Sequence, residues 1–359
     1  MKKMCIVYKH CVGHHLIFAI EIIRYLEKKG YKIFFLVNKN CKQNIMKIDF
    51  YKKYKTSISY VSFNKIDLMS VRKIFKFIVN NNINIIFFPT LDEWLVDIQF
   101  SIYKKLLLKK NIEIIGILHY LKKNRQNIFY KMYEYMSVKS LYWLINNENF
   151  KLVVMNKDIL SQYKKLKASS FLLKHPINKP ENYVHKVNKE NIKLLLFGEI
   201  SSKKNIEKIL YLFKTLDTKY QLQIVGKFEK SYEKRVMHLI NEQDNIIINN
   251  NYVSESLKKQ YYIESDIVII PYTNSLYSNG MESGVLYDAI NFSKPIIFPE
   301  EFDKSNILNF GQQFSFKDPI TFKKAINKII TNYNKYQNNI YNFKISMYND
   351  FIKGLNEIF

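Results

Sequence analysis

The sequence has little glycine, proline or cysteine. Nine Gly and seven Pro in 359 residues exclude a collagen-like chain and an architecture built on flexible linkers. The three cysteines, Cys5, Cys11 and Cys41, are odd in number and lack the paired spacing of metal ligands. They argue against a disulfide scaffold and a structural zinc site, and in favour of a reducing compartment.

Long apolar runs are also missing. No stretch approaches the roughly 18 apolar residues that a transmembrane helix needs. The N-terminus opens with lysines, but the apolar stretch that follows carries Lys9, His10 and two further histidines, and no small-residue cleavage site comes after it. Such a segment is a poor signal peptide. We therefore expect a cytoplasmic protein.

Acidic residues are scarce beside basic ones. The chain has 56 Lys and Arg against 31 Asp and Glu, a formal net charge of +25. An excess of this size suggests an anionic partner: nucleic acid, a phosphorylated small molecule or an anionic membrane face. The basic residues are spread along the chain and form no nucleic-acid recognition module, so we expect no nucleic-acid partner. An alternative source of part of the charge is an AT-rich genome, which favours Lys, Asn, Ile and Tyr.

Short apolar runs alternate with longer amphipathic stretches throughout the chain. The runs are continuous rather than alternating, which is typical of strands buried on both faces of a parallel sheet. Between two of them, Ile206, Ile209, Leu210, Phe213 and Leu216 form one apolar stripe of a helix. We therefore predict α/β structure with doubly wound sheets. The predicted strands are Met4–Tyr8, Lys32–Asn38, Ser57–Phe63, Ile83–Phe88, Ile112–His119, Leu152–Met155, Phe171–Leu173, Lys193–Phe197, Gln221–Val225, Asn245–Ile248, Asp266–Ile270 and Pro295–Phe298.

A polar, proline-marked stretch over residues 174–192 divides the chain. Strand and helix alternation restarts at Lys193. We predict two Rossmann-like domains, residues 1–180 and 181–359, each long enough to bury a core of its own. The last helix is expected to pack back on the N-terminal domain.

The first segment that carries chemistry is Lys193–Gly226. A buried strand ends in Gly198, a polar loop leads to a helix that begins near Lys204, and a second strand ends in Gly226. Ligands of open α/β sheets bind at the carboxyl ends of strands. Lys203 and Lys204 stand at such an end, where their charge opposes the dipole of the following helix. That placement favours a bound phosphate, held by an ammonium group and a helix N-terminus together. Two solvated loop lysines are the alternative.

The second such segment covers residues 266–299. A strand ends at Pro271, and a helix begins near Gly284 after a polar loop. Ser283 can cap this helix, and Gly284 lets a ligand approach the free backbone N–H groups. Asp288 lies about one turn into the helix, where it can accept hydrogen bonds from ribose hydroxyls. An ordinary capped helix is the alternative.

Together the two segments resemble the donor-binding half of GT-B glycosyltransferases, close to the retaining family 4, or group 1, enzymes of bacteria. The resemblance implies a GT-B fold, in which two Rossmann-like domains face each other across a cleft. It covers nearly the whole chain, but only the part from about 193 to 299 is specific. The matching motifs are Gly198 with Lys204-Asn205, Val225-Gly226, Asn251–Ser254, Ser265–Pro271, Ser283–Ala289 and Ser293–Ile297.

The resemblance implies a donor site and also shows where this chain departs from the family. Glu199 stands where the family has an arginine, so Lys204 must neutralise the diphosphate with its neighbours. The first acid of the usual Glu pair has no match in register, and Glu282 is the candidate to replace it. Asp288 takes the place of the second acid. The implied donor-binding residues are Gly13, Gly198, Lys203, Lys204, Gly226, Glu282, Ser283, Gly284, Val285 and Asp288.

The N-terminal half resembles the same family less specifically. Gly13, in the loop after the first strand, corresponds to a glycine that approaches the donor phosphate, and His14 and His15 are candidates for acceptor binding. His119 ends a strand where many family members have a histidine that touches the donor sugar. Asp92 follows another strand end and is a candidate base for the acceptor hydroxyl. A helix N-cap is the alternative for Asp92, and a packing histidine is the alternative for His119.

The function that the resemblance implies is sugar transfer from a nucleotide-diphosphate donor to a hydroxyl of a glycan or lipid-linked acceptor. It implies retention of configuration, no metal or other cofactor, and a place in lipopolysaccharide or capsule synthesis. The basic, aromatic segment Lys122–Ile145 suggests a helix on an anionic membrane surface, with a core-facing helix as the alternative. We thus expect a cytoplasmic enzyme, peripheral on the inner membrane face. A sugar-nucleotide epimerase and a non-catalytic GT-B partner protein remain alternatives.

Overall fold

The computed structural model describes most of the chain, and all structural statements below concern those residues. They are 2–8, 14–42, 57–61, 68–91, 111–118, 135, 139, 149–155, 170–181, 185–240, 244–251, 253–272, 283–303 and 307–359. The chain divides into two compact units. The N-terminal unit is Met1–Pro176 with Asn349–Phe359, and the C-terminal unit is Ile177–Tyr348. The sequence prediction divided the chain after residue 180, whereas here residues 177–180 belong to the C-terminal unit and residues 349–359 to the N-terminal unit.

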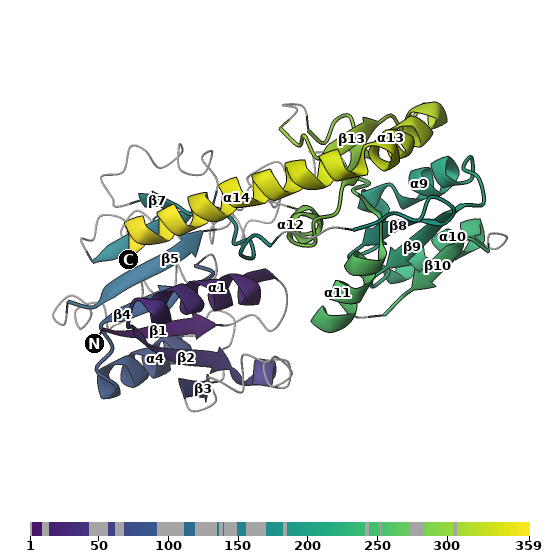
Figure 1. The fold of residues 1–359 in the computed structure, drawn as a ribbon. Coiled ribbons are helices and arrows are strands. Elements are labelled where there is room, and N and C mark those ends of the chain that lie inside the picture. Colours follow the sequence, from purple (N-terminus) through teal and green to yellow (C-terminus); the bar gives the residue numbers. More distant parts are fainter. Residues whose placement is uncertain are drawn as a thin grey trace. The chain divides into compact units, whose positions relative to one another are not determined.

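The N-terminal unit is built on one parallel sheet of seven strands, in the order β3-β2-β1-β4-β5-β6-β7 (Figure 1). The inner strands are buried almost throughout, as the continuous apolar runs predicted. Its elements are β1 (Lys3–Tyr8), α1 (His14–Lys28), β2 (Lys32–Asn38), the 3₁₀ turn η1 (Lys39–Cys41), β3 (Ile58–Val61), α4 (Leu68–Asn80), β4 (Ile85–Phe88), β5 (Glu113–Leu118), β6 (Phe150–Val154) and β7 (Ser170–Leu172).

The end of the last helix, α14 (Tyr333–Ile358), contributes to the core of this unit. Phe351, Leu355 and Ile358 are at most 2% exposed and join the apolar cluster around β1. Lys151 donates from Nζ to the carbonyl of Ile358 at 2.6 Å and so satisfies one of the last carbonyls of the helix. The C-terminal residues are therefore part of the N-terminal core.

Two findings concern the cysteines. Cys5 is a free, buried thiol in β1, whereas Cys41 is disulfide-bonded, which the odd cysteine count gave no reason to expect.

In the part of the chain that the structure describes, no helix has the length and apolarity needed to cross a membrane.

The C-terminal unit has a second parallel sheet, of six strands in the order β10-β9-β8-β11-β12-β13 (Figure 1). Its strands are β8 (Ile192–Phe197), β9 (Tyr220–Val225), β10 (Ile246–Asn249), β11 (Ile267–Ile269), β12 (Ile296–Pro299) and β13 (Gly311–Phe314). Its helices are the 3₁₀ turn η3 (Ser202–Lys204), α9 (Ile206–Phe213), α10 (Lys230–Ile240), α11 (Glu255–Glu264), α12 (Gly284–Asn291), α13 (Pro319–Thr331) and the larger part of α14.

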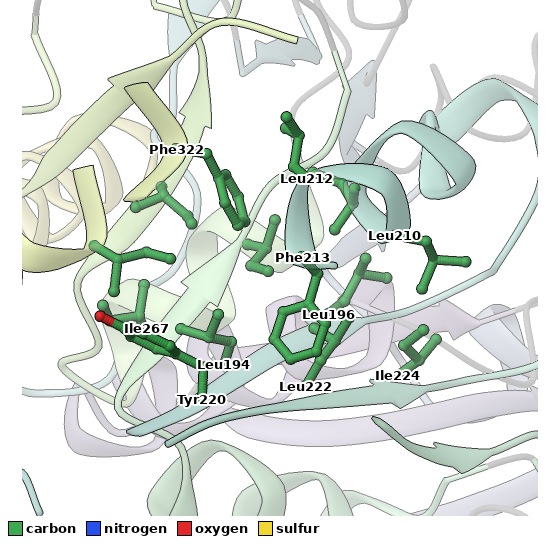
Figure 2. Packing of buried hydrophobic residues seen from close by; sticks show 14 of the residues in the cluster. Leu194, Leu196, Leu210, Leu212, Phe213, Tyr220, Leu222, Ile224, Ile267 and Phe322 are labelled. Atoms are coloured by element: carbon green, nitrogen blue, oxygen red, sulfur yellow. The ribbon is translucent and has the colours of Figure 1, made fainter. Parts of the chain in front are cut away.

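Helix α9 packs its apolar stripe on the central strands of this sheet. Figure 2 shows Phe213 of α9 among leucines and isoleucines of β8 and β9, with Phe322 of α13 beside it. The predicted helix is shorter than expected at both ends: it begins at Ile206, and Leu216 lies beyond its last residue. The residues at Lys203 and Lys204 form a separate 3₁₀ turn, which places them in the loop before the helix.

Each predicted strand overlaps a strand of the structure, and the strand that the prediction missed is β13. Its sequence, Gly-Gln-Gln-Phe, has only its two end residues buried. It lies at the edge of the sheet and pairs with β12 alone, so its two central glutamines are only half-buried. A Cβ on Gly311 would lie 2.5 Å from the Phe298 ring, so close packing on β12 requires glycine there. Polar composition and a leading glycine concealed this strand from a search for apolar runs.

Ser293, after α12, has a left-handed backbone with φ of +55°. A non-glycine residue in this conformation costs roughly 1–2 kcal/mol. Glycine avoids this cost, but it loses more backbone entropy on folding, which destabilises the folded state by about 0.5–1 kcal/mol. We therefore expect Ser293→Gly to raise the free energy of unfolding by about 0.5–1 kcal/mol, measured by urea denaturation. Ser265→Gly is the matched control, because Ser265 has φ of −81° and donates from Oγ to the Tyr262 carbonyl. It should destabilise, and a loss of stability in Ser293→Gly would contradict the assigned strain.

Candidate active site

The topology of the C-terminal sheet creates a switch point between β8 and β11. From β8 the chain moves outward through β9 to β10, then returns to the other side of β8 to form β11. Ligands of such sheets bind at the carboxyl ends of the strands at this point, where the loops diverge. The loop after β8 and the loop after β11 both begin there, and they carry the first group of predicted site residues.

Gly198 and Gly226 follow the carboxyl ends of β8 and β9 and lie in close contact. Their φ angles are +105° and +142°, which side chains rarely allow. A Cβ on Gly226 would lie 1.9 Å from the carbonyl oxygen of Gly198. Glycine at both positions therefore lets the two strand ends meet and shapes the loop that carries Lys204.

Asn205 fixes the end of that loop. Its φ and ψ are 52° and 30°, in the left-handed region that asparagine tolerates better than most residues. Its Nδ2 donates to the carbonyl of Pro271 at 3.1 Å, which ties the loop after β8 to the loop after β11. Asn205 thus supplies the left-handed residue that connects η3 to α9.

The ammonium group of Lys204 lies at the centre of this arrangement. Its Nζ is 3.3 Å from the position that a Cβ on Gly198 would take, and 5.7 Å from the centroid of the Tyr272 ring. Burial lowers the pKa of Lys204, and the carboxylate of Glu199 offsets part of this effect. Among the described residues Lys204 has no salt bridge. A partly desolvated cation of this kind is suited to binding an anion.

The start of α12 stands beside Lys204. Ser283 caps the helix, as predicted, by accepting a hydrogen bond on Oγ from the Leu286 N–H at 3.2 Å, and the Tyr272 hydroxyl bonds to the same Oγ. A Cβ on Gly284 would have no described atom within 4 Å. Val285 Cγ2 lies 3.5 Å from the position that a Cβ on Gly198 would take, so α12 and the loop after β8 converge.

Asp288 has a partner that the sequence did not indicate. Its Oδ1 lies 3.2 Å from Nζ of Lys258 on α11, and the same ammonium is 2.9 Å from Oε2 of Glu255. Burial raises the pKa of Asp288, and the ion pair with Lys258 lowers it part of the way back. For Lys258, burial lowers the pKa, but the two carboxylates outweigh burial and raise it overall.

The structure thus brings together Gly198, Lys204, Gly226 and the residues from Ser283 to Val285, with Asp288 one turn further along α12. Lys203 is exposed on η3. Sequence reasoning missed Tyr272 and Lys258. For Tyr272 a signal was present, since it follows the strand-ending Pro271. For Lys258 the sequence offered none, because its pairing with Asp288 depends on how two helices meet.

The remaining predicted residues lie outside the described part of the chain. They are Gly13, Asp92, His119 and Glu282, and the same holds for the segment Lys122–Ile145 except Tyr135 and Lys139. His14 and His15 open α1, but their side chains are among those left undescribed. In sequence, Gly13, Asp92 and His119 follow β1, β4 and β5, which are neighbours in the N-terminal sheet.

A sequence match covers most of the C-terminal unit. Residues 179–345 match the model of the family described as glycosyl transferases group 1. All the described residues of the Lys204 site lie within the matched residues. Among curated proteins, no sequence matched.

Solved structures similar to this chain include HepE, WaaB and WaaG. Anabaena HepE, solved with UDP and glucose, has a TM-score of 0.66 at 11% identity, covering 100% of this chain and 98% of HepE. The lipopolysaccharide outer core galactosyltransferase WaaB has a TM-score of 0.60 at 12% identity, covering 99% and 100%. WaaG, a glycosyltransferase of lipopolysaccharide biosynthesis, has 0.61 at 10%, covering 99% of each chain. At these identities the likeness shows the fold alone, and the predicted GT-B fold class is confirmed.

Proposed function

We propose that this chain transfers a sugar from a nucleoside-diphosphate donor to a hydroxyl of a glycan or lipid-linked acceptor. The observation that carries the proposal is the partly desolvated Lys204 ammonium beside Gly198, where Val285 at the start of α12 also approaches. It lies at the sheet's switch point, within the residues that match the group 1 glycosyltransferase model. The structures of HepE with UDP and with UDP-glucose support a donor of this class.

In the proposed reaction the C-terminal unit stabilises the leaving diphosphate. As the glycosidic bond breaks, negative charge develops on the diphosphate oxygens. The Lys204 ammonium and the free N–H groups at the start of α12 are fixed in advance, so they lower the barrier without reorganising. Asp288 accepts hydrogen bonds from the ribose. The Lys204 ammonium and the N–H groups of α12 supply positive charge without a metal ion, and the family resemblance favours retention of configuration.

The acceptor side of the proposal rests on the N-terminal unit. Gly13, His14 and His15, Asp92 and His119 stay predictions for contacts with the acceptor, the sugar or the transferred proton. The likeness to WaaB and WaaG favours a surface polysaccharide as the product. We propose a cytoplasmic reaction at the inner membrane face, where a net charge of +25 would favour anionic lipid.

A donor-consumption assay tests this function. The purified chain is incubated with UDP-glucose, UDP-galactose, UDP-N-acetylglucosamine and GDP-mannose, with and without a panel of octyl glycosides, and released nucleotide and sugar products are measured. Nucleotide release that requires an octyl glycoside, with a new glycosidic product, is the expected result. Isomerised UDP-N-acetylglucosamine without any acceptor would support the epimerase alternative instead. Donors left intact in every mixture would favour a non-catalytic partner protein.

A further inference from the structure

Lys258 joins two carboxylates at the edge of the Lys204 site. Its Nζ lies 2.9 Å from Glu255 on its own helix α11 and 3.2 Å from Asp288 on α12. The side chain of Lys258 is 12% exposed and that of Asp288 is 22% exposed, whereas Glu255 is 68% exposed. The pair between α11 and α12 is therefore largely removed from solvent, while Asp288 can still be reached by a ligand.

The ion pair occupies one oxygen of Asp288 and leaves the other available. Lys258 contacts Oδ1, and Oδ2 has no hydrogen-bond partner among the described residues. A neutral carboxyl group would be a poor acceptor, and burial raises the pKa of Asp288. The Lys258 ammonium opposes this rise, so it favours an ionised carboxylate held in one orientation.

Of the other ionisable groups near Asp288, Glu255 opposes its ionisation and Tyr262 is neutral. Glu255 raises the pKa of Asp288 through its negative charge. Tyr262, on the same helix α11, is fully buried, and its hydroxyl is unpartnered within the described part of the chain. Burial first and the charge of Asp288 second raise the pKa of Tyr262, so this phenol stays neutral. Lys258 is thus the one described cation that faces Asp288.

We propose that Lys258 is a positioning residue for nucleotide recognition: it holds Asp288 so that the free oxygen accepts hydrogen bonds from the ribose hydroxyls. The inference rests on the proposed function, because it assumes that a nucleotide occupies the site. Lys258 itself does not contact the nucleotide. A hydrogen bond from a hydroxyl to an ionised, oriented carboxylate discriminates about tenfold or more against a ligand that lacks the hydroxyl.

The test compares ribose and deoxyribose ligands in matched variants. The probes are UDP and GDP, each beside its 2′-deoxy and 3′-deoxy analogue, with dissociation constants measured by calorimetry. The wild-type chain is expected to prefer the ribose form of its nucleotide about tenfold or more over at least one deoxy analogue. Asp288→Asn and Lys258→Met should both bring that ratio to within about twofold of unity. The ribose preference of the double variant should fall no further than that of either single variant, because the two residues act as one unit.

Two control variants separate positioning from structural or charge effects. Lys259→Met removes the same charge from the exposed neighbouring lysine of α11 and should keep the wild-type ratio. Lys258→Arg retains a cation next to Asp288 and should restore most of the discrimination. If Lys258→Met is too unstable to purify, Lys258→Arg and Lys258→Gln provide the same comparison. The Gln variant is expected to lose most of the ribose preference and the Arg variant to keep most of it.

The ribose preference measured over a pH series distinguishes positioning from a purely structural role of Lys258, because a structural role would not change the pH at which the preference disappears. Without Lys258 the pKa of Asp288 rises further, so as pH falls the carboxylate is protonated at a higher pH than in the wild type. Residual discrimination in Lys258→Gln should therefore disappear at a higher pH. A wild-type ratio in Lys258→Met overturns the proposal, and so does an equal loss for ribose and deoxyribose ligands, which would indicate contact with the diphosphate. Failure of the wild-type chain to bind any nucleotide would overturn the proposed function itself.

Discussion

Lys204→Met is expected to weaken nucleoside-diphosphate binding by roughly 100-fold or more. Methionine keeps much of the apolar stem that passes Gly198 and the Tyr272 ring, but it removes the only charge that the described part of the site directs at an anion. The loss is large because the ammonium is partly desolvated, so its attraction for a phosphate is screened less than that of a surface lysine. Calorimetric titration with UDP and GDP measures the change.

The matched control for this prediction is Lys214→Met. Lys214 caps the far end of α9 and is exposed, so the variant removes the same charge without touching the site. Any decrease in affinity that comes from net charge alone will appear in both variants and will shrink at higher salt. Equal affinities of the Lys204→Met and Lys214→Met variants would show that the diphosphate does not bind at Lys204.

Gly226→Ala is expected to destabilise the C-terminal unit by about 2–5 kcal/mol. The new Cβ would lie 1.9 Å from the Gly198 carbonyl oxygen, which is backbone and cannot rotate away as a side chain can. Alanine would also be strained at a φ of +142°. Relief requires the strand ends of β8 and β9 to separate, and this shift moves the loop that carries Lys204. Urea denaturation measures the free energy, and nucleotide affinity should fall in the fraction that remains folded.

Gly284→Ala serves as the control for stability. It is the same substitution at the start of α12, where the added Cβ would meet no described atom within 4 Å and the backbone is not left-handed. Its free energy of unfolding should stay within about 0.5 kcal/mol of the wild type, as for a surface substitution. A Gly226→Ala variant as stable as Gly284→Ala would refute the close contact between the two strand ends.

Much of the fold could be predicted because burial on both faces leaves a clear mark in sequence. Strands such as β8 and β11 consist mainly of Leu, Ile and Val, and a parallel sheet covered by helices buries such runs on both faces. The edge strand β13 could not be found this way, because its central glutamines are only half-buried. The end of α9 was also misjudged, since Leu216 continues the helical spacing although the chain has already left the helix.

The candidate site was predictable where it depends on backbone geometry and not where it depends on packing. Glycines at strand ends and a serine before a helix predict a tight loop and a cap, and both are present. Asn205 and Ser293 both have positive φ, a conformation that asparagine tolerates better than serine. The pairing of Lys258 with Asp288 joins residues thirty positions apart on two helices, and no periodicity records such a contact.

The measurement that tests the central claim most directly is thermal unfolding of the wild-type chain and Lys204→Met against UDP-, GDP-, ADP-, CMP- and dTDP-sugars. A ligand that binds only the folded state raises the unfolding midpoint. We predict that sugars of one nucleotide raise the wild-type midpoint and leave that of Lys204→Met unchanged. No rise with any of the five classes, or an equal rise in both proteins, would contradict a donor site at Lys204.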